Sequence, residues 1–308
     1  MFGNLITRRI SALSWAVSFA LAASLALTAV EARAQSGTVK VTQLSDSVHM
    51  LRGKGGNIAV SVGADGVIMI DDQFAPASKE IAKAIKSIDD RPIRFVINTH
   101  WHGDHTGGNK NFKALGATIV AHDNVRAEMI GRKFKNAQGK FVADDTLPVV
   151  TFRDRISFHL NGETVEITKV PASHTSGDAI VHFTGSNVLH MGDVFFNGLY
   201  TFFDGSSGGR FEGMIEALGI GLEIAGPATK IVPGHGGLAT RDDLRQHLDR
   251  MIVIRDRVKA ALAKGVSVQD FITSKPTRDL EDAFGEGYKV MDAAQFLKLV
   301  YVDLKRGK

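Results

Sequence analysis

The chain has 308 residues, of which 44% are hydrophobic and 23% charged, and its formal net charge is +4. This length is sufficient for a large core, in one domain or in two half-domains that share an interface. The chain contains no cysteine, which excludes disulfide bonds and thiolate ligands to a metal ion.

The N-terminal segment has the order of features that is typical of a secretory signal peptide. Arg8 and Arg9 precede an apolar stretch that ends near Val30, and small residues then lead to Ala34. We therefore predict that residues 1–34 are a signal peptide of bacterial type, cleaved after Ala34, and that the mature protein is periplasmic or secreted. A membrane anchor is the alternative, because the apolar stretch is long for a signal peptide.

The predicted cleavage also changes the charge of the protein. Residues 1–34 contain three arginines and one glutamate, a net charge of +2, so the mature chain would keep +2 of the +4. A nearly neutral chain gives no electrostatic reason to expect a nucleic-acid partner. Once the segment is cleaved, we also expect no membrane association. The sequence does not predict an oligomeric state.

The rest of the chain alternates between strand and helix patterns. Short β-branched or alternating runs, separated by turns rich in Gly, Asn and Asp, predict strands at 39–51 (two short ones), 57–62, 67–71, 93–97, 117–121, 156–160, 164–167, 179–183, 187–191 and 230–232. Apolar residues at helical spacing predict helices at 78–88, 123–131, 211–224 and 241–264, and two or three more within 266–308. By themselves these patterns indicate only a mixed α and β protein.

One polar stretch directly follows the strand predicted at 93–97. It holds four potential metal ligands within six residues, namely His100, His102, Asp104 and His105. We expect this cluster where a strand ends and the chain turns, outside any helix. His100 and His102 are two residues apart and point the same way in extended backbone, and Gly103 lets the chain bend after them. One loop could thus supply two ligands to each of two metal ions.

The His-x-His-x-Asp-His pattern, followed by three isolated ligands, resembles the metallo-β-lactamase superfamily. The isolated residues are His174 in Pro-Ala-Ser-His-Thr-Ser-Gly-Asp, Asp193 in His-Met-Gly-Asp and His235 in Val-Pro-Gly-His-Gly. The resemblance covers residues 38–262, which we interpret as a hydrolase domain followed by a C-terminal helical extension, 263–308. It implies an α+β fold, the αββα sandwich, in which two mixed β-sheets lie face to face with helices on the outer faces.

The resemblance also implies a role for each of these residues. His100, His102 and His174 would bind one zinc ion, Asp104, His105 and His235 would bind a second, and Asp193 would bridge the two. Two zinc ions about 3.5–4 Å apart can share a hydroxide. Asp104 would orient this hydroxide, which attacks a polarised carbonyl group. Asp71, at the end of the strand predicted at 67–71, would support the ligand loop by hydrogen bonds, with a plain surface carboxylate as the alternative.

Aromatic residues that follow Asp193 are candidates for the substrate pocket. Phe196, Tyr200 and Phe202 lie in a segment rich in glycine and asparagine, which indicates a loop beside the site. The alternative is that they belong to the ordinary core, because aromatic side chains favour burial. The hydroxyl group of Tyr200 could assist a carbonyl oxygen.

The function implied by the resemblance is that of an exported dinuclear zinc hydrolase. Its partner would be a small-molecule substrate with an ester, lactone, thioester or amide bond. A zinc β-lactamase is one alternative, although Asp193 and Phe196 stand where the β-lactamases with a cysteine ligand carry that cysteine and a substrate-binding lysine. An iron-dependent oxygenase is another, although His102 stands where the diferric type has glutamate. A metal-binding protein without turnover is the third.

Overall fold

The computed structural model of the protein describes residues 39–133, 146–284 and 291–307. Residues from Val39 onward form one compact unit. The predicted signal peptide, 1–34, lies outside the described residues and remains a prediction. Among the described residues, no helix has both the length and the apolar character required to cross a membrane.

Seven strands form the first sheet in the order of the sequence, β1 to β7. They are β1 (Lys40–Gln43), β2 (Val48–Arg52), β3 (Ile58–Ser61), β4 (Val67–Ile70), β5 (Ile93–Asn98), β6 (Thr118–His122) and β7 (Val150–Phe152). The strands from β1 to β4 pair antiparallel, and those from β4 to β7 pair parallel. The carboxyl ends of β4 and β5 therefore meet at one edge of the sheet. Strand β7 was not expected from the sequence, because it directly follows a polar stretch without a regular pattern.

Five strands form the second sheet, in the order β12-β11-β10-β9-β8. They are β8 (Arg155–Leu160), β9 (Glu163–Lys169), β10 (Ala179–Phe183), β11 (Val188–His190) and β12 (Lys230–Val232). All neighbours pair antiparallel except β11 and β12, which are parallel. The chain segments that follow β11 and β12 thus leave the sheet at the same edge.

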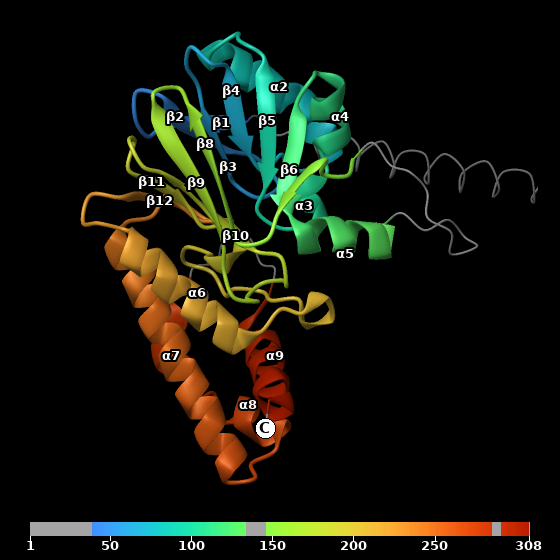
Figure 1. Ribbon diagram of the computed structural model, residues 1–308. Helices are drawn as coiled ribbons and strands as arrows, with labels where there is room; N and C mark the ends of the chain where they lie inside the picture. Colours follow the sequence, from blue (N-terminus) through green and yellow to red (C-terminus); the bar gives the residue numbers. More distant parts are fainter. Residues whose placement is uncertain (1–38, 134–145, 285–290, 308) are drawn as a thin grey trace, which may run out of the picture. The chain divides into compact units, whose positions relative to one another are not determined.

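Helices cover the outer face of each sheet (Figure 1). The α-helices are α2 (Ser78–Ile88), α3 (Gly103–Thr106), α4 (Asn109–Ala114), α5 (Asp123–Lys133), α6 (Phe211–Ile224), α7 (Arg241–Ala263), α8 (Val268–Thr273) and α9 (Ala293–Arg306). The 3-10 helices are η1 (Ala75–Ala77), η2 (Gly192–Val194), η3 (Gly205–Ser207) and η4 (Arg278–Ala283). Figure 1 shows α6, α7 and α9 together, away from α2 and α4.

Three layers of apolar side chains account for this arrangement. A central layer, which includes Ile97 and Val181, joins the facing surfaces of the two sheets. A second layer packs α2 and α4 on the first sheet, and a third packs α6, α7 and α9 on the second. Because each sheet buries both faces, its central strands are apolar on both sides. The predicted α+β fold, an αββα sandwich, is therefore confirmed.

The C-terminal helices pack directly on the second half of the sandwich. Asp303 of α9 accepts a hydrogen bond from the backbone N–H of Phe211 over 3.0 Å, and it forms an ion pair with Arg210 over 2.9 Å. The ring of Tyr200 stacks on that of Phe284, with 4.0 Å between the ring centroids. These contacts connect the C-terminal segment to the loop that follows η2, and the domain boundary after residue 262 remains a prediction.

Candidate metal centre

The ligand-rich stretch after β5 lies partly in a helix, which corrects the expectation of a turn outside any helix. Asp104 and His105 belong to the single turn α3, whereas His102 still has extended backbone. The N–H groups of His105 and Thr106 both donate to the carbonyl oxygen of His102 over 3.0 Å, which closes this turn. A four-residue helix is too short to produce an apolar period in the sequence.

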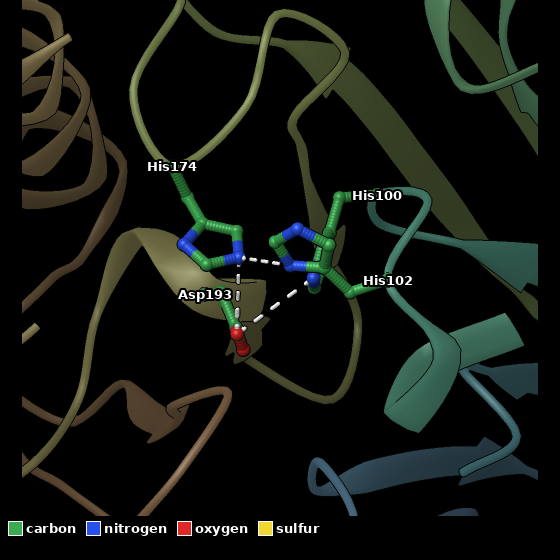
Figure 2. A group of neighbouring side chains, drawn as sticks. All are labelled: His100, His102, His174 and Asp193. Atoms are coloured by element: carbon green, nitrogen blue, oxygen red, sulfur yellow. Dashed lines mark hydrogen bonds and ion pairs between the residues drawn. The ribbon is translucent and has the colours of Figure 1, made fainter. Parts of the chain in front are cut away.

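The structure brings all seven predicted ligands together, from four segments of the chain. They form two groups that share Asp193: His100, His102, His174 and Asp193 in one, and Asp104, His105, Asp193 and His235 in the other. Within each group the potential ligand atoms all lie within 4.8 Å of one another. Figure 2 shows that the side chains of the first group converge from separate segments.

In the first group, the nitrogen and oxygen atoms that could bind a metal ion lie close to one another. His174 Nε2 lies 2.7 Å from His102 Nδ1 and 3.3 Å from Asp193 Oδ2. His100 Nε2 lies 3.7 Å from the same carboxylate oxygen. Two imidazole nitrogen atoms this close repel each other through their lone pairs unless a proton or a cation is shared between them.

The second group contains a second carboxylate. His235 Nε2 lies 3.2 Å from Asp104 Oδ2 and 3.4 Å from Asp193 Oδ2. His105 Nε2 lies 3.1 Å from Asp193 Oδ1. Two histidines and two aspartates therefore surround one point, with nitrogen and oxygen atoms only.

Contacts on the outer side of each ring fix which nitrogen atom faces inward. His105 Nδ1 donates to Asp71 over 2.7 Å, and His174 Nδ1 donates to the carbonyl oxygen of Phe202 over 2.7 Å. His100 Nδ1 lies 3.0 Å from the hydroxyl group of Thr99, which itself donates to Asp71. The outer nitrogen atom thus carries the proton, and the inner one presents its lone pair when the ring is neutral.

Asp71 is fully buried and has three hydrogen-bond partners at the site. It accepts from the N–H and the hydroxyl group of Thr99, each over 2.8 Å, as well as from His105. Its backbone is left-handed, with φ at +62°. Strained backbone of this kind persists only where the surroundings over-determine it, and here the parallel ends of β4 and β5 do so.

Sequence reasoning missed Asp204, which supports the first group from the opposite side. His102 Nε2 donates to Asp204 Oδ2 over 3.3 Å, so that His102 Nδ1 faces inward. The other carboxylate oxygen accepts from the N–H and the hydroxyl group of Ser206. The sequence Asp-Gly-Ser-Ser signals such a local turn, but nothing in it predicts a contact with His102, which is 102 residues away.

Burial and mutual charge shift the pKa values of the site in opposite directions. Burial lowers the pKa of His102 to about 4, with a further contribution from His174. Burial also opposes the charged form of His235, but the carboxylates of Asp193 and Asp104 outweigh it and raise the pKa to about 9. The neighbouring histidines likewise outweigh burial at Asp193 and hold its pKa well below the ordinary value. The second group therefore needs positive charge to balance its carboxylates.

The residues present fit divalent cations. The buried atoms His100 Nε2, His105 Nε2 and Asp193 Oδ1 have no hydrogen-bond partner among the described residues, although buried polar atoms are nearly always satisfied. A cation at each group would satisfy these atoms and supply the positive charge that the carboxylates require. Imidazole and carboxylate ligands suit zinc, and they also suit iron and manganese.

The three aromatic candidates lie in different surroundings. Phe196 is buried, and its ring centroid lies 4.7 Å from that of His235 and 6.3 Å from that of His174. Phe202 is half-buried, 5.7 Å from the ring of His174. Tyr200 packs among the C-terminal aromatic rings instead. Two of the three therefore border the candidate centre, and the part that any of them plays in substrate binding stays a prediction.

The sequence was compared with models of known protein families. A family model of the metallo-beta-lactamase superfamily matches residues 51–246. That range contains all seven predicted ligands and Asp71. The match thus covers both sheets from the end of β2 onward, together with the candidate centre.

Individual relatives are more distant. The alpha subunit of 2,4-dinitroanisole O-demethylase from Nocardioides sp. (strain JS1661) is 29% identical over 44% of this chain and 40% of its own length. Hydroxyacylglutathione hydrolase from Methylococcus capsulatus is 32% identical over 40% of this chain and 43% of its own length. The matched segment thus spans less than half the length of each of these relatives.

Among solved structures, a metallo-beta-lactamase from Pontibacter korlensis superposes with a TM-score of 0.59. It is 18% identical, and the match covers 69% of this chain and 98% of that one. At this identity the likeness concerns the fold, and it agrees with the two mixed sheets and outer helices described above.

Proposed function

The chain belongs to the metallo-beta-lactamase superfamily, and from this premise we propose that it is a hydrolase that uses two zinc ions to cleave an ester, lactone, thioester or amide bond in a small molecule. The observation that carries the proposal is the pair of ligand groups joined by Asp193. Each group offers four nitrogen or oxygen ligand atoms, and buried ligand atoms in both form no hydrogen bond with any residue that the structure describes. His100, His102 and His174 would hold one ion, and Asp104, His105 and His235 the other.

When bound, the two ions would lower the pKa of a water molecule towards neutrality and polarise a carbonyl oxygen. The protein itself contributes position and exclusion of solvent. Asp104, whose side chain is 21% exposed, is the more accessible carboxylate of the two in its group and would orient the attacking water. The ring of Phe196 covers one side of His174 and His235, which removes bulk water from the charged groups.

Reaction through a protein nucleophile has little support in this chain. There is no cysteine, and the Gly-x-Ser-x-Gly match at residues 205–209 lies in the 3-10 helix η3 rather than on a sharp turn from strand to helix. Its serine, Ser207, donates a hydrogen bond to the carboxylate of Asp204 and not to a histidine that could act as a base. Attack by an activated water molecule needs neither. This supports hydrolysis without a covalent intermediate between substrate and protein.

The proposed substrate range includes β-lactams only as a second candidate. The solved structures with this fold include metallo-beta-lactamases, which supports the alternative. Against it, Phe196 presents a buried apolar ring at the position where a substrate-binding lysine is expected from the resemblance. The relatives named hydroxyacylglutathione hydrolase support a thioester or a related acyl compound instead.

A panel of substrates with controlled metal content tests the proposal. Protein purified without added metal is analysed for zinc and iron, and is then assayed with an aryl ester, a lactone, a thioester and a chromogenic cephalosporin, with and without chelator. We expect about two zinc ions per chain and chelator-sensitive hydrolysis of at least one acyl substrate. Iron with little zinc would favour the oxygenase alternative, and metal without turnover would favour a binding protein.

We further propose that the protein acts after export. The proposal rests on the order of charged, apolar and small residues in 1–34. Expression of the full chain in a bacterial host, followed by fractionation and N-terminal sequencing, is the test. We expect the periplasmic or secreted form to begin at Gln35, and a full-length form retained in the membrane fraction would favour the anchor.

A further inference from the structure

A cavity of about 750 Å³ opens beside the second ligand group. Three segments form its walls: the turn between β2 and β3, the loop after η2 and the turn after β12. Its lining residues are Arg52, Gly53, Lys54, Gly55, Asn57, Asn197, Gly198, Leu199, His235, Gly236 and Gly237. The volume lies within the range of small-molecule sites, and His235 joins the cavity to the candidate metal centre.

Hydrogen bonds between the three segments hold the walls in place. The side-chain amide of Asn57 donates to the carbonyl oxygens of Pro233 and Gly236, over 2.8 and 3.1 Å. The side-chain amide of Asn197 donates to the carbonyl oxygen of Gly237 over 3.2 Å. The side-chain amides of both asparagines thus donate to backbone groups of the cavity walls. A ligand in the cavity would therefore be bound by the other polar side chains.

The remaining polar side chains are positively charged. Arg52 and Lys54 are exposed, and neither has an ion pair or a side-chain hydrogen bond within the part of the chain that the structure describes. The Arg52 guanidinium extends to the opposite wall, since a Cβ atom built on Gly237 would lie 4.0 Å from its Nη1. No Asp or Glu is among the described lining residues, so the two cations face no compensating charge there.

Building on the proposed hydrolase function, we propose that this cavity selects substrates that carry a carboxylate group, bound by Arg52 and Lys54. The guanidinium of Arg52 can bind a carboxylate through two N–H groups, and Lys54 adds a second charge. Leu199 offers apolar contact to the chain between this carboxylate and the bond that is cleaved near His235. The lining segments include no helix N-terminus, the usual partner of phosphate groups, which favours a carboxylate as the anion.

Matched esters provide the kinetic test. The metal-loaded protein is assayed with 4-nitrophenyl butanoate, which is neutral, and with the 4-nitrophenyl monoester of pentanedioic acid, which has a free carboxylate on the acyl chain. A phosphorylated ester of similar length separates carboxylate from phosphate recognition. We expect kcat/KM to be at least about tenfold higher for the carboxylate ester than for the other two. Equal values for the neutral and carboxylate esters would overturn the inference, and a preference for the phosphorylated ester would replace carboxylate with phosphate.

Substitutions identify the residues responsible. In Arg52→Gln and Lys54→Gln, the KM of the carboxylate ester should rise by about five- to twentyfold, with little change in kcat and no change for the neutral ester. Gly237→Asp, which places a carboxylate beside Arg52, should have the same effect, whereas Gly237→Ala should not. Lys79→Gln, an exposed lysine on α2, is the control for a lost surface charge. Equal loss with both esters in the Arg52 and Lys54 variants would contradict a role in recognition.

Binding measurements separate this inference from the proposed function. Calorimetric titration with pentanedioate should show affinity for the metal-loaded wild-type protein that falls at least about tenfold in the Arg52→Gln/Lys54→Gln double variant. Carboxylates that bind only to the metal ions would bind both proteins equally, which would overturn the inference. If pentanedioate binding depends on the two cations but no ester is hydrolysed, the hydrolase proposal fails and the carboxylate site stands.

Discussion

The two halves of the sandwich build the candidate centre in different ways. The first sheet supplies His100, His102, Asp104 and His105 from one continuous loop after β5, and it supports that loop with the buried carboxylate of Asp71. The second sheet supplies His174, Asp193 and His235 one at a time, from two loops and the 3-10 helix η2. These are fixed largely by backbone groups, such as the carbonyl oxygen of Phe202 that accepts from His174. The ligands of the first half thus depend on the carboxylates of Asp71 and Asp204, and those of the second on close packing of the main chain.

Removal of the residue common to both groups should have the largest effect. In Asp193→Asn the side chain keeps its size but loses the charge that faces His100, His105 and His235. We expect loss of both metal ions and a fall in turnover of at least about a thousandfold, because charge stabilisation by the ions amounts to several kcal/mol. Metal analysis and chelator-controlled assays measure this, with His159→Gln, at an exposed position on β8, as the control. Retention of two ions per chain would contradict the shared role of Asp193.

Matched substitutions at Asp71 and Asp204 compare how strongly each carboxylate supports the histidine that it contacts. Asp71→Asn should weaken metal binding at the second group by about 10- to 100-fold, because His105 loses its charged acceptor. Asp204→Asn should weaken the first group by about tenfold or less, since Asp204 is partly exposed and its contact with His102 is long, at 3.3 Å. Competition with a chromophoric chelator gives both affinities. Equal effects would show that the buried carboxylate of Asp71 and the partly exposed one of Asp204 support the loop after β5 equally well.

The contrast between the halves also explains what the sequence could and could not predict. Helices 78–88 and 211–224 have the predicted bounds, because burial of one side imposes a clear period. The strand 230–232 also has the predicted bounds, and it was identified as a short β-branched run. The ligand loop is predictable because its residues are adjacent along the chain. The three single ligands were identified only through the family resemblance, since an isolated His or Asp after a strand has no specific pattern of its own.

The sequence did not predict features that arise only from tertiary packing. The contact of Asp204 with His102 joins segments that meet only in the folded state, as does the cavity between Arg52 and Gly237. The turn-forming residues around them are visible in the sequence, but a turn signal does not say which distant segment the turn approaches. Metal ligands can therefore be predicted from the sequence more readily than the residues that orient them or that bind the substrate.

Main-chain packing in the second half is tested by Gly234→Ala. A Cβ atom at Gly234 would collide with Asp193 Oδ1 and would lie 2.6 Å from the carbonyl oxygen of Gly192. We expect a loss of about 1–3 kcal/mol in the free energy of unfolding, with weaker metal binding, because a shift of Asp193 affects both groups. Gly237→Ala is the control, since its Cβ atom meets only the Arg52 guanidinium, 4.0 Å away. Denaturant titration of metal-free and metal-loaded protein measures both changes, and equal stability of the two variants would contradict the packing argument.

The smallest expected effect concerns His247 on α7, which packs beneath the loop that follows Asp193. Its ring is fully buried, 5.1 Å from the ring of Phe195, and its Nε2 lies 3.1 Å from the hydroxyl group of Thr201. Burial, with a further contribution from Arg250, lowers its pKa from 6.5 to about 3. The native state therefore resists protonation that the unfolded state accepts below pH 6.5, so this residue's contribution to stability falls as the pH decreases from 6.5 towards 3.

The pH dependence of His247 is isolated by comparison with His247→Gln. As the pH falls through that window, the free energy of unfolding of the wild-type protein should decrease by about 1.4 kcal/mol per pH unit more than that of the variant. Between pH 7 and pH 5 this difference amounts to about 2 kcal/mol. Denaturant titrations at several pH values, with the variant's curve subtracted, remove the contribution of the other titrating groups. Parallel curves would mean that the loop after Asp193 admits water to the ring of His247. In that case the second half of the centre would be less tightly packed than the first, and its ligands would depend on the bound ions for their positions.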